Sequence, residues 1–258
     1  MALEIPRSFH RIWIGGADMP EDFVAWGESW LELNPGWTMR TWTEDDLPEL
    51  LDEPDAREAF ERGRHFSEKS DLLRYELVWR HGGIYVDTDF ECLKPIEALL
   101  DGVTAFAAAM KGEQVNTAIF GAVPGHPALE RLRLEVRPRV GVGHTKHATA
   151  THFFTSVVTA FPDVRIFPGE LFYPPPEGDL SEAYGVHRAQ LSWKPHERMR
   201  RRIEELEKHL ASSERKRHKA EERLAAAERR LAEREGSPIG RARATAAGLV
   251  RLGRRRSS

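Results

Sequence analysis

The chain has 258 residues, of which 40% are hydrophobic, a share that is ordinary for a soluble globular protein and sufficient for one sizeable core. Its single cysteine, Cys92, excludes an internal disulfide and favours a reducing compartment. The first residues show no charged segment followed by an apolar run, and no run of roughly 18 apolar residues occurs anywhere. We therefore expect a cytoplasmic protein.

The net charge of −3 conceals two parts of opposite charge. Residues 1–193 contain 18 Lys and Arg against 31 Asp and Glu, whereas residues 194–258 contain 20 against 10. This asymmetry, together with a change in hydrophobic spacing, predicts three segments: a folded body (1–195), a charged helix or coiled coil (196–235) and a basic tail (236–258).

The first third of the body alternates between strand and helix patterns. A strand is predicted within Ile5–Ile14, which is rich in apolar and aromatic residues and stops at two glycines. A helix is predicted for Pro20–Leu33 and a short strand for Thr38–Trp42. Thr43 then suits the N-cap of a further helix, because the three acidic residues after it complement the helix dipole.

A longer helix is predicted from Ser67, a good N-cap, to the glycine pair Gly82-Gly83, the first of which can adopt the left-handed conformation that ends a helix. A strand follows from Ile84. The alternation of strands and helices predicts an α/β fold, with a largely parallel sheet covered on both faces. The remaining predicted elements are strands at 103–109, 115–122, 164–167 and 185–187, and helices at 127–136 and 152–160.

The strand after the glycine pair ends in the sequence D-T-D. Side chains alternate along a strand, so Tyr85, Asp87 and, if the strand persists, Asp89 point to one face. Two carboxylates on one side of a strand end can share a hard divalent cation, and their oxygens suit Mg²⁺ or Mn²⁺. A solvated turn is the simpler alternative, but the apolar strand and the glycine stop before it favour a metal site.

Asp71 and Arg74 lie three residues apart on the predicted helix, hence on one face of it. They could present an acceptor and a donor fork to a polyhydroxyl ligand, or pair with each other, and both readings remain open. The sequence lacks the glycine-rich loops of P-loop and dinucleotide-binding proteins, the nucleophile elbow of serine hydrolases and a cysteine-rich zinc site.

The two C-terminal segments differ from the body. Apolar residues recur at a 3–4 spacing through 196–235, which favours self-association as a coiled coil, although Ser213 and Arg217 interrupt the seam. A single charged helix is the alternative. After Gly236 there is no acidic residue, and the arginines with a few apolar residues suit an anionic membrane surface. A solvated tail explains the same composition equally well.

Several motifs together resemble a known family. They are I-P-R-S-F-H-R-I-W-I-G-G (5–16), S-D-L-L-R-Y (70–75), G-G-I-Y-V-D-T-D (82–89) and L-K-P-I (93–96). Their order continues through N-T-A-I-F-G-A (116–122) and P-G-H-P (124–127) to H-R-A-Q-L-S-W (187–193). This set resembles the DXD sugar-binding-region glycosyltransferases of family 32, which include mannosyltransferases and capsular polysaccharide transferases.

The resemblance implies a GT-A type, Rossmann-like mixed sheet with helices on both faces, a nucleotide-sugar donor, a divalent metal and retention of anomeric configuration. It places Trp13 on the nucleobase, where a flat ring can stack. Asp71 would accept hydrogen bonds from the donor sugar, and Arg74 would reach sugar and phosphate. Ser192 and Trp193 match the end of a late family motif that contacts the diphosphate.

The same resemblance assigns the residues around the D-T-D motif. Tyr85 and Asp87 would line the ribose, Asp87 would also touch the metal through water, and Asp89 would bind the metal directly. His187 matches a late histidine that approaches the metal. The residues that this comparison assigns to catalysis are Asp71, Arg74, Asp87 and Asp89.

Two departures from the family pattern concern the acceptor side and the third metal contact. Where the family often has T-G-P, this chain has Thr149-Ala150-Thr151. Where the family usually has an aromatic residue two positions after the late histidine, this chain has Ala189. Both departures leave the D-T-D site unchanged.

From the sequence we therefore expect a metal-dependent, retaining hexosyltransferase that moves a sugar from a UDP- or GDP-sugar to a hydroxyl acceptor, in cell-surface polysaccharide or glycolipid synthesis. The basic tail would place it on the inner face of the membrane. Two alternatives remain: a metal-dependent phosphohydrolase, and a nucleotide-sugar-sensing scaffold recruited by the coiled coil and tail. The acidic body argues against nucleic-acid binding as the main task.

Overall fold

The computed structural model describes residues 4–110, 112, 114–142, 148–175, 178–188 and 217–219. The chain divides into two units, Met1–Trp193 and Lys194–Ser258. The predicted coiled coil at 196–235 lies outside the described residues except for three helical residues, 217–219, and the basic tail lies wholly outside them. The segment boundaries drawn from charge therefore stay predictions, and the following concerns the first unit.

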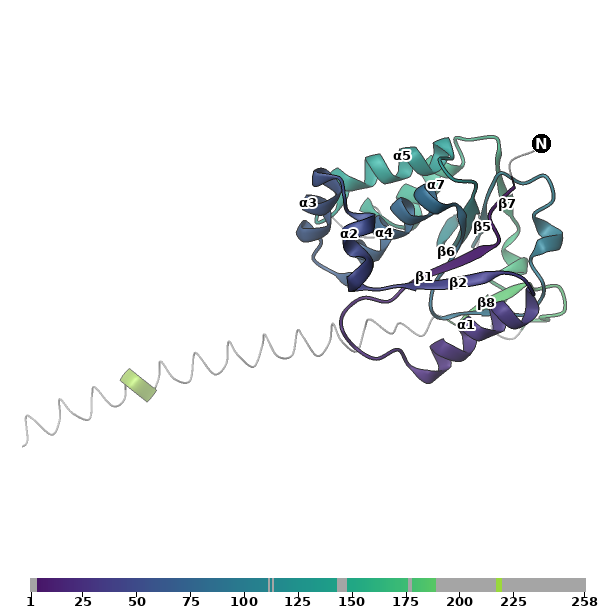
Figure 1. Ribbon diagram of the computed structural model, residues 1–258, viewed down its shortest axis with the longest axis horizontal. Helices are drawn as coiled ribbons and strands as arrows, with labels where there is room; N and C mark the ends of the chain where they lie inside the picture. The colour runs from purple at the N-terminus through teal and green to yellow at the C-terminus, as the bar shows by residue number, and fades with distance from the viewer. Residues whose placement is uncertain are drawn as a thin grey trace, which may run out of the picture. The chain divides into compact units, whose positions relative to one another are not determined.

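A six-stranded mixed sheet forms the centre of this unit, with the strand order β2-β1-β3-β6-β5-β7 among the described residues (Figure 1). Strand β1 pairs in parallel with β2 and β3, and β5 pairs in parallel with β7. The bounds of the strands are Ser8–Ile12 (β1), Thr38–Trp42 (β2), Gly83–Val86 (β3), Ala105–Ala109 (β5), Val115–Ala122 (β6) and Val164–Phe167 (β7).

Strand β6 is where the sheet departs from a parallel arrangement, because it runs antiparallel to both β3 and β5. Only five residues separate β5 from β6, and the N–H of Met110 donates to the carbonyl of Gln114 across this connection. Parallel neighbours need a crossover of a dozen residues or more, and a link of this length therefore forces an antiparallel hairpin. The mixed sheet implied by the family resemblance is confirmed.

Helices cover both faces of the sheet (Figure 1). One face carries the long helix α4 together with α5 and α7, and the opposite face carries α1 and a second sheet in which β4 pairs antiparallel with β8. The bounds are Glu21–Leu33 (α1), Leu47–Leu50 (α2), Pro54–Arg62 (α3), Phe66–His81 (α4), Pro127–Val136 (α5), Thr151–Val158 (α7), Phe90–Cys92 (β4) and Gly185–His187 (β8). No described helix combines the length and apolarity needed to cross a membrane.

Each face of the sheet has its own apolar core, and alternation along β3 divides its residues between them. Tyr85 packs with Phe120 and the helices α4, α5 and α7. Ile84 and Val86 pack on the other side with Trp30 of α1. The alternation predicted for this strand is thus confirmed, and it aims Tyr85 and the residue after Val86 toward the helix that precedes them in the chain.

Helix α4 begins two residues earlier than an N-cap at Ser67 predicts. It starts at Phe66, its N-cap is His65, and the side chain of His65 makes no capping hydrogen bond. The predicted N-cap, Ser67, is therefore wrong. The carboxylate of the buried Glu68 reaches back instead and accepts a hydrogen bond of 3.0 Å from the backbone N–H of Arg64, which satisfies a donor at this end.

A buried ion-pair network attaches α4 to its neighbours on the helical face. Glu76, with 0% of its side chain exposed, accepts hydrogen bonds of 3.1 Å from Arg133 of α5 and 3.0 Å from the Nε of Arg137. Both arginines also bind Glu53, which precedes α3, at 2.8 Å. These contacts fix the helix whose middle turns carry Asp71 and Arg74.

Two glycines reverse the chain between α4 and β3. Gly82, at φ 65°, donates to the carbonyl of Val78 and ends the helix. Gly83, at φ 84°, starts β3 against β1, and a Cβ atom there would lie 2.5 Å from the carbonyl oxygen of Ser8. Only glycine permits both the positive φ and this close approach. The chain therefore passes from the end of α4 directly into strand β3 of the sheet.

Gly83→Ala should destabilise the protein more than Gly36→Ala. Both residues have φ 84°, but a Cβ at Gly36 would meet nothing within 4 Å, so Gly36→Ala should cost only the left-handed penalty of about 1–2 kcal/mol. Gly83→Ala adds a clash with the backbone, which should raise the loss in unfolding free energy by at least about 2 kcal/mol. Urea denaturation measures both; equal losses would show that β3 can shift.

Candidate functional site

The D-T-D motif lies in a tight turn at the end of β3. The backbone N–H of Asp87 donates to the carbonyl of Ala118 on β6 at 2.8 Å, which extends the sheet by one bond beyond Val86. The N–H of Phe90 then donates to the carbonyl of Asp87 and closes a turn that leads into β4. Asp89 therefore lies in the turn and not on a continuing strand, which corrects the conditional expectation from alternation.

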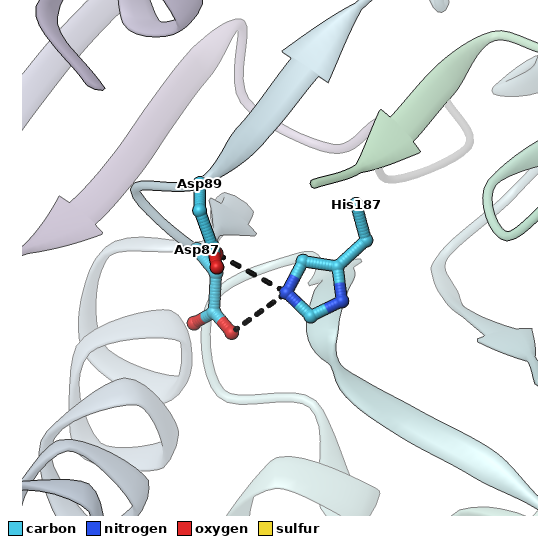
Figure 2. A group of neighbouring side chains, drawn as sticks. All are labelled: Asp87, Asp89 and His187. Atoms are coloured by element: carbon cyan, nitrogen blue, oxygen red, sulfur yellow. Dashed lines mark hydrogen bonds and ion pairs between the residues drawn. The ribbon is translucent and has the colours of Figure 1, made fainter. Parts of the chain in front are cut away.

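His187 reaches this turn from a distant part of the chain. Strand β8 pairs antiparallel with β4, and the register places His187 opposite Phe90. The imidazole stacks on the Phe90 ring, with centroids 5.5 Å apart and planes at 18°. Its Nε2 lies 3.1 Å from the Oδ1 of Asp89 and 3.9 Å from the Oδ2 of Asp87 (Figure 2). Both carboxylates point toward the same ring nitrogen.

Asp87, Asp89 and His187 form a candidate metal centre. One ligand atom from each residue lies within 4.8 Å of the other two. Two carboxylate oxygens and one imidazole nitrogen are a donor set that fits a divalent cation, and the part-exposed side chains leave room for further ligands. The residues present therefore fit the metal that the D-T-D motif predicts.

The acid–base properties of these groups reflect their crowding. Burial raises the pKa of Asp87, the charge of Arg74 opposes this shift, and the neighbouring carboxylate of Asp89 adds to it. Burial alone would lower the pKa of His187, but the hydrogen bond to Asp89 and the charge of Asp87 outweigh it and raise the pKa. The centre thus concentrates negative charge that attracts a cation.

Arg74 links the metal centre to helix α4. Its Nη1 lies 3.3 Å from the Oδ1 of Asp87, and its Nη2 lies 3.5 Å from the Oδ1 of Asp71. The guanidinium also lies over the ring of Tyr85, 4.6 Å from the centroid, and only 6% of the residue is exposed. Burial would lower the pKa of Arg74, but the charge of Asp87 and other acidic neighbours outweighs it and raises the pKa.

A bulge in β6 supplies the backbone acceptor for Arg74. Ala107 of β5 pairs with Phe120, but the next residue, Ala108, pairs with Asn116, so three residues of β6 are left out of this ladder. The carbonyl of one of them, Thr117, accepts a hydrogen bond of 2.8 Å from Nη1 of Arg74. Bulges free backbone groups for other partners, and here the freed group holds the guanidinium in place.

Asp71 is buried on the side of Arg74 away from the metal centre. Its residue is 3% exposed, and its Oδ2 accepts a hydrogen bond of 2.8 Å from the hydroxyl of Thr149. Burial raises the pKa of Asp71 to about 6, although Arg74 and the Thr149 hydroxyl act in the opposite direction. The pairing of Asp71 with Arg74 that spacing suggested is present, and one arginine serves both carboxylates.

Two tyrosines complete the described part of the site. The Tyr85 hydroxyl donates to the Oδ1 of Asp87 at 2.7 Å, which orients the carboxylate toward the turn. The Tyr173 ring packs edge-on against His187, with centroids 6.0 Å apart and planes at 89°. Tyr173 follows a short 3₁₀ helix, Gly169–Leu171, and sequence reasoning missed it because aromatic residues before prolines carry no chemical pattern of their own.

Trp13 lies at the same edge of the sheet. Because β1 runs parallel to β3, the residue after β1 emerges at the end where Asp87 emerges from β3. The indole N–H donates to the carbonyl of Ala17 at 2.6 Å, and the half-buried ring packs edge-on against Phe23. Ser192 and Trp193, which the sequence assigns to the diphosphate, lie outside the described residues, as does Ala189.

The sequence of the segment that carries most of this site matches a known protein family. Residues 20–105 match the family described as "Glycosyltransferase sugar-binding region containing DXD motif". The matched segment contains α4, the D-T-D turn and both acidic groups bound by Arg74. Residues 20–105 therefore form a sugar-binding region of the DXD type, which indicates that the protein is a glycosyltransferase.

Individual relatives agree with this assignment. This chain is 26% identical over 214 residues to an uncharacterised glycosyltransferase of Acanthamoeba polyphaga mimivirus, and the match covers 74% of this chain and 85% of the viral protein. It is 27% identical over 127 residues to inositol phosphoceramide mannosyltransferase 3 of Schizosaccharomyces pombe, covering 48% of this chain but only 35% of the yeast protein. Among solved structures, the PaToxG glycosyltransferase matches with a TM-score of 0.54 and 14% identity over 61% of this chain and 70% of that one. This likeness concerns the fold alone.

Asp71→Asn should change how stability depends on pH. The folded-state pKa of Asp71, about 6, exceeds the ordinary value of 3.8, so the folded protein must ionise a buried carboxyl that the unfolded chain ionises freely. Stability of the wild type is therefore lost as pH rises from about 4 to about 6. Relative to wild type, Asp71→Asn should gain up to about 3 kcal/mol over this window.

Urea denaturation at pH 4, 5, 6 and 7 measures this difference. Asp101→Asn, which changes an exposed carboxyl, is the matched control and should show the wild-type dependence on pH. A constant difference in unfolding free energy between Asp71→Asn and wild type across the four pH values would mean that Asp71 ionises without hindrance in the folded state.

Proposed function

We propose that the protein is a metal-dependent, retaining glycosyltransferase that transfers a hexose from a nucleotide-sugar donor to a hydroxyl acceptor. The single observation that carries the proposal is the placement of Arg74 between Asp71 and Asp87. One buried cation thereby joins a carboxylate suited to sugar hydroxyls with a carboxylate at the metal centre. A ligand that has both a sugar and a charged diphosphate meets both requirements.

The donor would lie along the edge formed by the carboxyl ends of β1 and β3 and the middle turns of α4. Trp13 would stack on the base, and Tyr85 with Asp87 would line the ribose. Asp71 would accept hydrogen bonds from hydroxyls of the transferred sugar, since an ionised carboxylate is an acceptor only. Ser192 and Trp193 would contact the diphosphate from the segment that follows β8.

Arg74 would stabilise the departing nucleoside diphosphate. Its guanidinium is held by the carbonyl of Thr117 and by two carboxylates, so it is oriented before any ligand arrives. Preorganised cations of this kind stabilise charge that develops on a leaving group, because no reorganisation is needed during the reaction. A bound Mn²⁺ or Mg²⁺, held by Asp87, Asp89 and His187, would neutralise the diphosphate oxygens as the glycosidic bond to them breaks.

Retention of anomeric configuration is what the family resemblance implies, and we propose that it proceeds without a covalent intermediate on a carboxylate. Retaining glycosidases use two carboxyl groups about 5 Å apart, one of them as a nucleophile. Here Asp87 and Asp89 are assigned to the cation, and Asp71 is held by Thr149 and Arg74 beside the sugar. The acceptor hydroxyl would therefore attack from the face that the leaving group vacates, and its proton would pass to a diphosphate oxygen.

The proposed setting is glycolipid or cell-surface polysaccharide synthesis on the cytoplasmic side of a membrane. Relatives include enzymes that carry the name inositol phosphoceramide mannosyltransferase, which supports a lipid-linked or glycan hydroxyl as acceptor. The basic segment 236–258 would hold the enzyme on anionic lipid, and 196–235 would mediate self-association. Base and sugar of the donor are left open between UDP- and GDP-hexoses.

A donor panel tests the proposal. UDP-glucose, UDP-galactose, UDP-N-acetylglucosamine and GDP-mannose are titrated into the protein by calorimetry, with Mn²⁺ and with EDTA. At least one should bind only with Mn²⁺, and Asp89→Asn should weaken that binding at least about tenfold because a direct metal ligand is lost. Asp179→Asn, an exposed carboxylate that accepts only from Ser181 in the described structure, is the matched control.

The same panel separates the two alternatives. A phosphohydrolase would release inorganic phosphate from the nucleotide sugar, and a sensing scaffold would bind it without hydrolysis or transfer. Absence of Mn²⁺-dependent binding by every nucleotide sugar of the panel would refute the proposal.

The stereochemistry of the product is a separate prediction. With an α-linked donor from the panel and water or a simple alcohol as acceptor, proton NMR during the first turnovers should detect the α-anomer. An initial β-anomer would exclude same-face attack, and the assignment of the three aspartates would then have to include a general base on the opposite side of the sugar.

A further inference from the structure

Among the hydrogen bonds described above, the bond from Thr149 to Asp71 is the one that reaches this carboxylate from outside helix α4. The residue lies just before α7, it is 0% exposed, and its hydroxyl donates to the Oδ2 of Asp71 at 2.8 Å. Arg74 approaches the other carboxylate oxygen, Oδ1, at 3.5 Å. With each oxygen directed by a different partner, the plane of the carboxylate is fixed, and each oxygen keeps a lone pair for a further donor.

Tyr75 holds Thr149 in position. Its hydroxyl donates to the backbone carbonyl of Thr149 at 2.8 Å, and the tyrosine itself is 0% exposed. The Tyr75 ring lies parallel to that of Phe154 on α7, with centroids 5.8 Å apart and planes at 4°. Helix α4 thus binds the segment before α7 through residues 71 and 75, which lie one turn apart on the same face of the helix.

We propose that Thr149 is a positioning residue for the sugar-binding carboxylate: it orients Asp71 and stabilises its ionised form, and the Tyr75 hydroxyl fixes Thr149 in turn. The inference rests on the proposed function, because it takes Asp71 to be the group that receives sugar hydroxyls. It assigns to Thr149 a contribution to sugar binding without direct contact with the reacting atoms.

The charges around Asp71 explain why an uncharged hydrogen-bond donor, the Thr149 hydroxyl, suits this carboxylate. Arg74 favours the ionised carboxylate, whereas the acidic groups of Glu68 on the same helix and Asp87 after β3 disfavour it. Tyr75 and Tyr85 also face this carboxylate and remain neutral, because burial raises the pKa of each. A hydroxyl that donates to Asp71 stabilises its charge without adding a second cation, which would compete with Arg74 for the diphosphate.

The experiment compares the affinity for a nucleotide sugar with that for its nucleoside diphosphate. Each nucleotide sugar of the donor panel, and its own nucleoside diphosphate (UDP or GDP), is titrated by calorimetry in the presence of Mn²⁺ into the full-length wild type, Thr149→Val and Thr149→Ser. Thr149→Val keeps the shape of the side chain but removes the hydroxyl. It should weaken binding of the nucleotide sugar about tenfold and leave the diphosphate unchanged, since Asp71 faces only the sugar. Thr149→Ser should restore most of the loss.

The pH dependence is a second readout that a merely structural role would not move. Sugar binding requires ionised Asp71 and should fall in the wild type as pH drops below about 6. Loss of the Thr149 hydroxyl raises the pKa of Asp71, so in Thr149→Val this acidic limb should shift upward by about one pH unit. Thr159→Val is the matched control, because Thr159 is the exposed C-cap of α7 and its described hydroxyl hydrogen bond goes to the carbonyl of Thr155 in that helix.

The outcomes separate the two proposals. If the wild type binds none of the four nucleotide sugars of the panel, the proposed function fails and this inference fails with it. If the wild type binds one but Thr149→Val binds it equally well with an unmoved acidic limb, only the role of Thr149 is refuted. Should Thr149→Val fail to fold, Tyr75→Phe retains the stacked ring and removes its hydroxyl. It should weaken nucleotide-sugar binding in the same direction, and unchanged binding would overturn the inference.

Discussion

The charge of Arg74 is the interaction on which the site depends. A guanidinium that is 6% exposed cannot persist without compensation, and the fold supplies two carboxylates and one carbonyl from three different elements. Each of these carboxylates would in turn be costly to bury without the arginine. Helix α4, strand β3 and the bulge in β6 are therefore coupled electrostatically, and none can move far without leaving a buried charge unpaired.

Local sequence patterns could predict most of the elements and the first half of the site. The strand Thr38–Trp42, the hairpin strand Val115–Ala122 and the helix Pro127–Val136 follow the predicted bounds, because their periodicity and turn residues agree with their tertiary surroundings. The spacing of Asp71 and Arg74 predicted a shared helical face, and the alternation along β3 predicted that Tyr85 and Asp87 would lie on one side. These inferences involve only neighbours within one turn or one strand.

What the sequence could not predict depends on long-range pairing or on a backbone irregularity. The approach of His187 to Asp89 requires the β4–β8 register across 98 residues, which only the motif order of the family suggested. The position of Asp89 in a turn depends on a hydrogen bond from Phe90 that no propensity encodes. Thr149 belongs to a segment that departs from the family's T-G-P at the two residues after it, and a threonine before a helix is ordinarily a cap that gives no sign of a buried carboxylate nearby.

The bulge in β6 also bears on which parts of this chain can vary during evolution. In a regular hairpin, a residue gained or lost near the tip can be absorbed by sliding one strand along the other. Here the ladder with β5 is interrupted at Thr117, while the same stretch stays paired to β3 through the carbonyl of Ala118. A change in length would therefore displace the acceptor of Arg74. This irregular stretch of the sheet is, for this reason, one where insertions and deletions should be poorly tolerated.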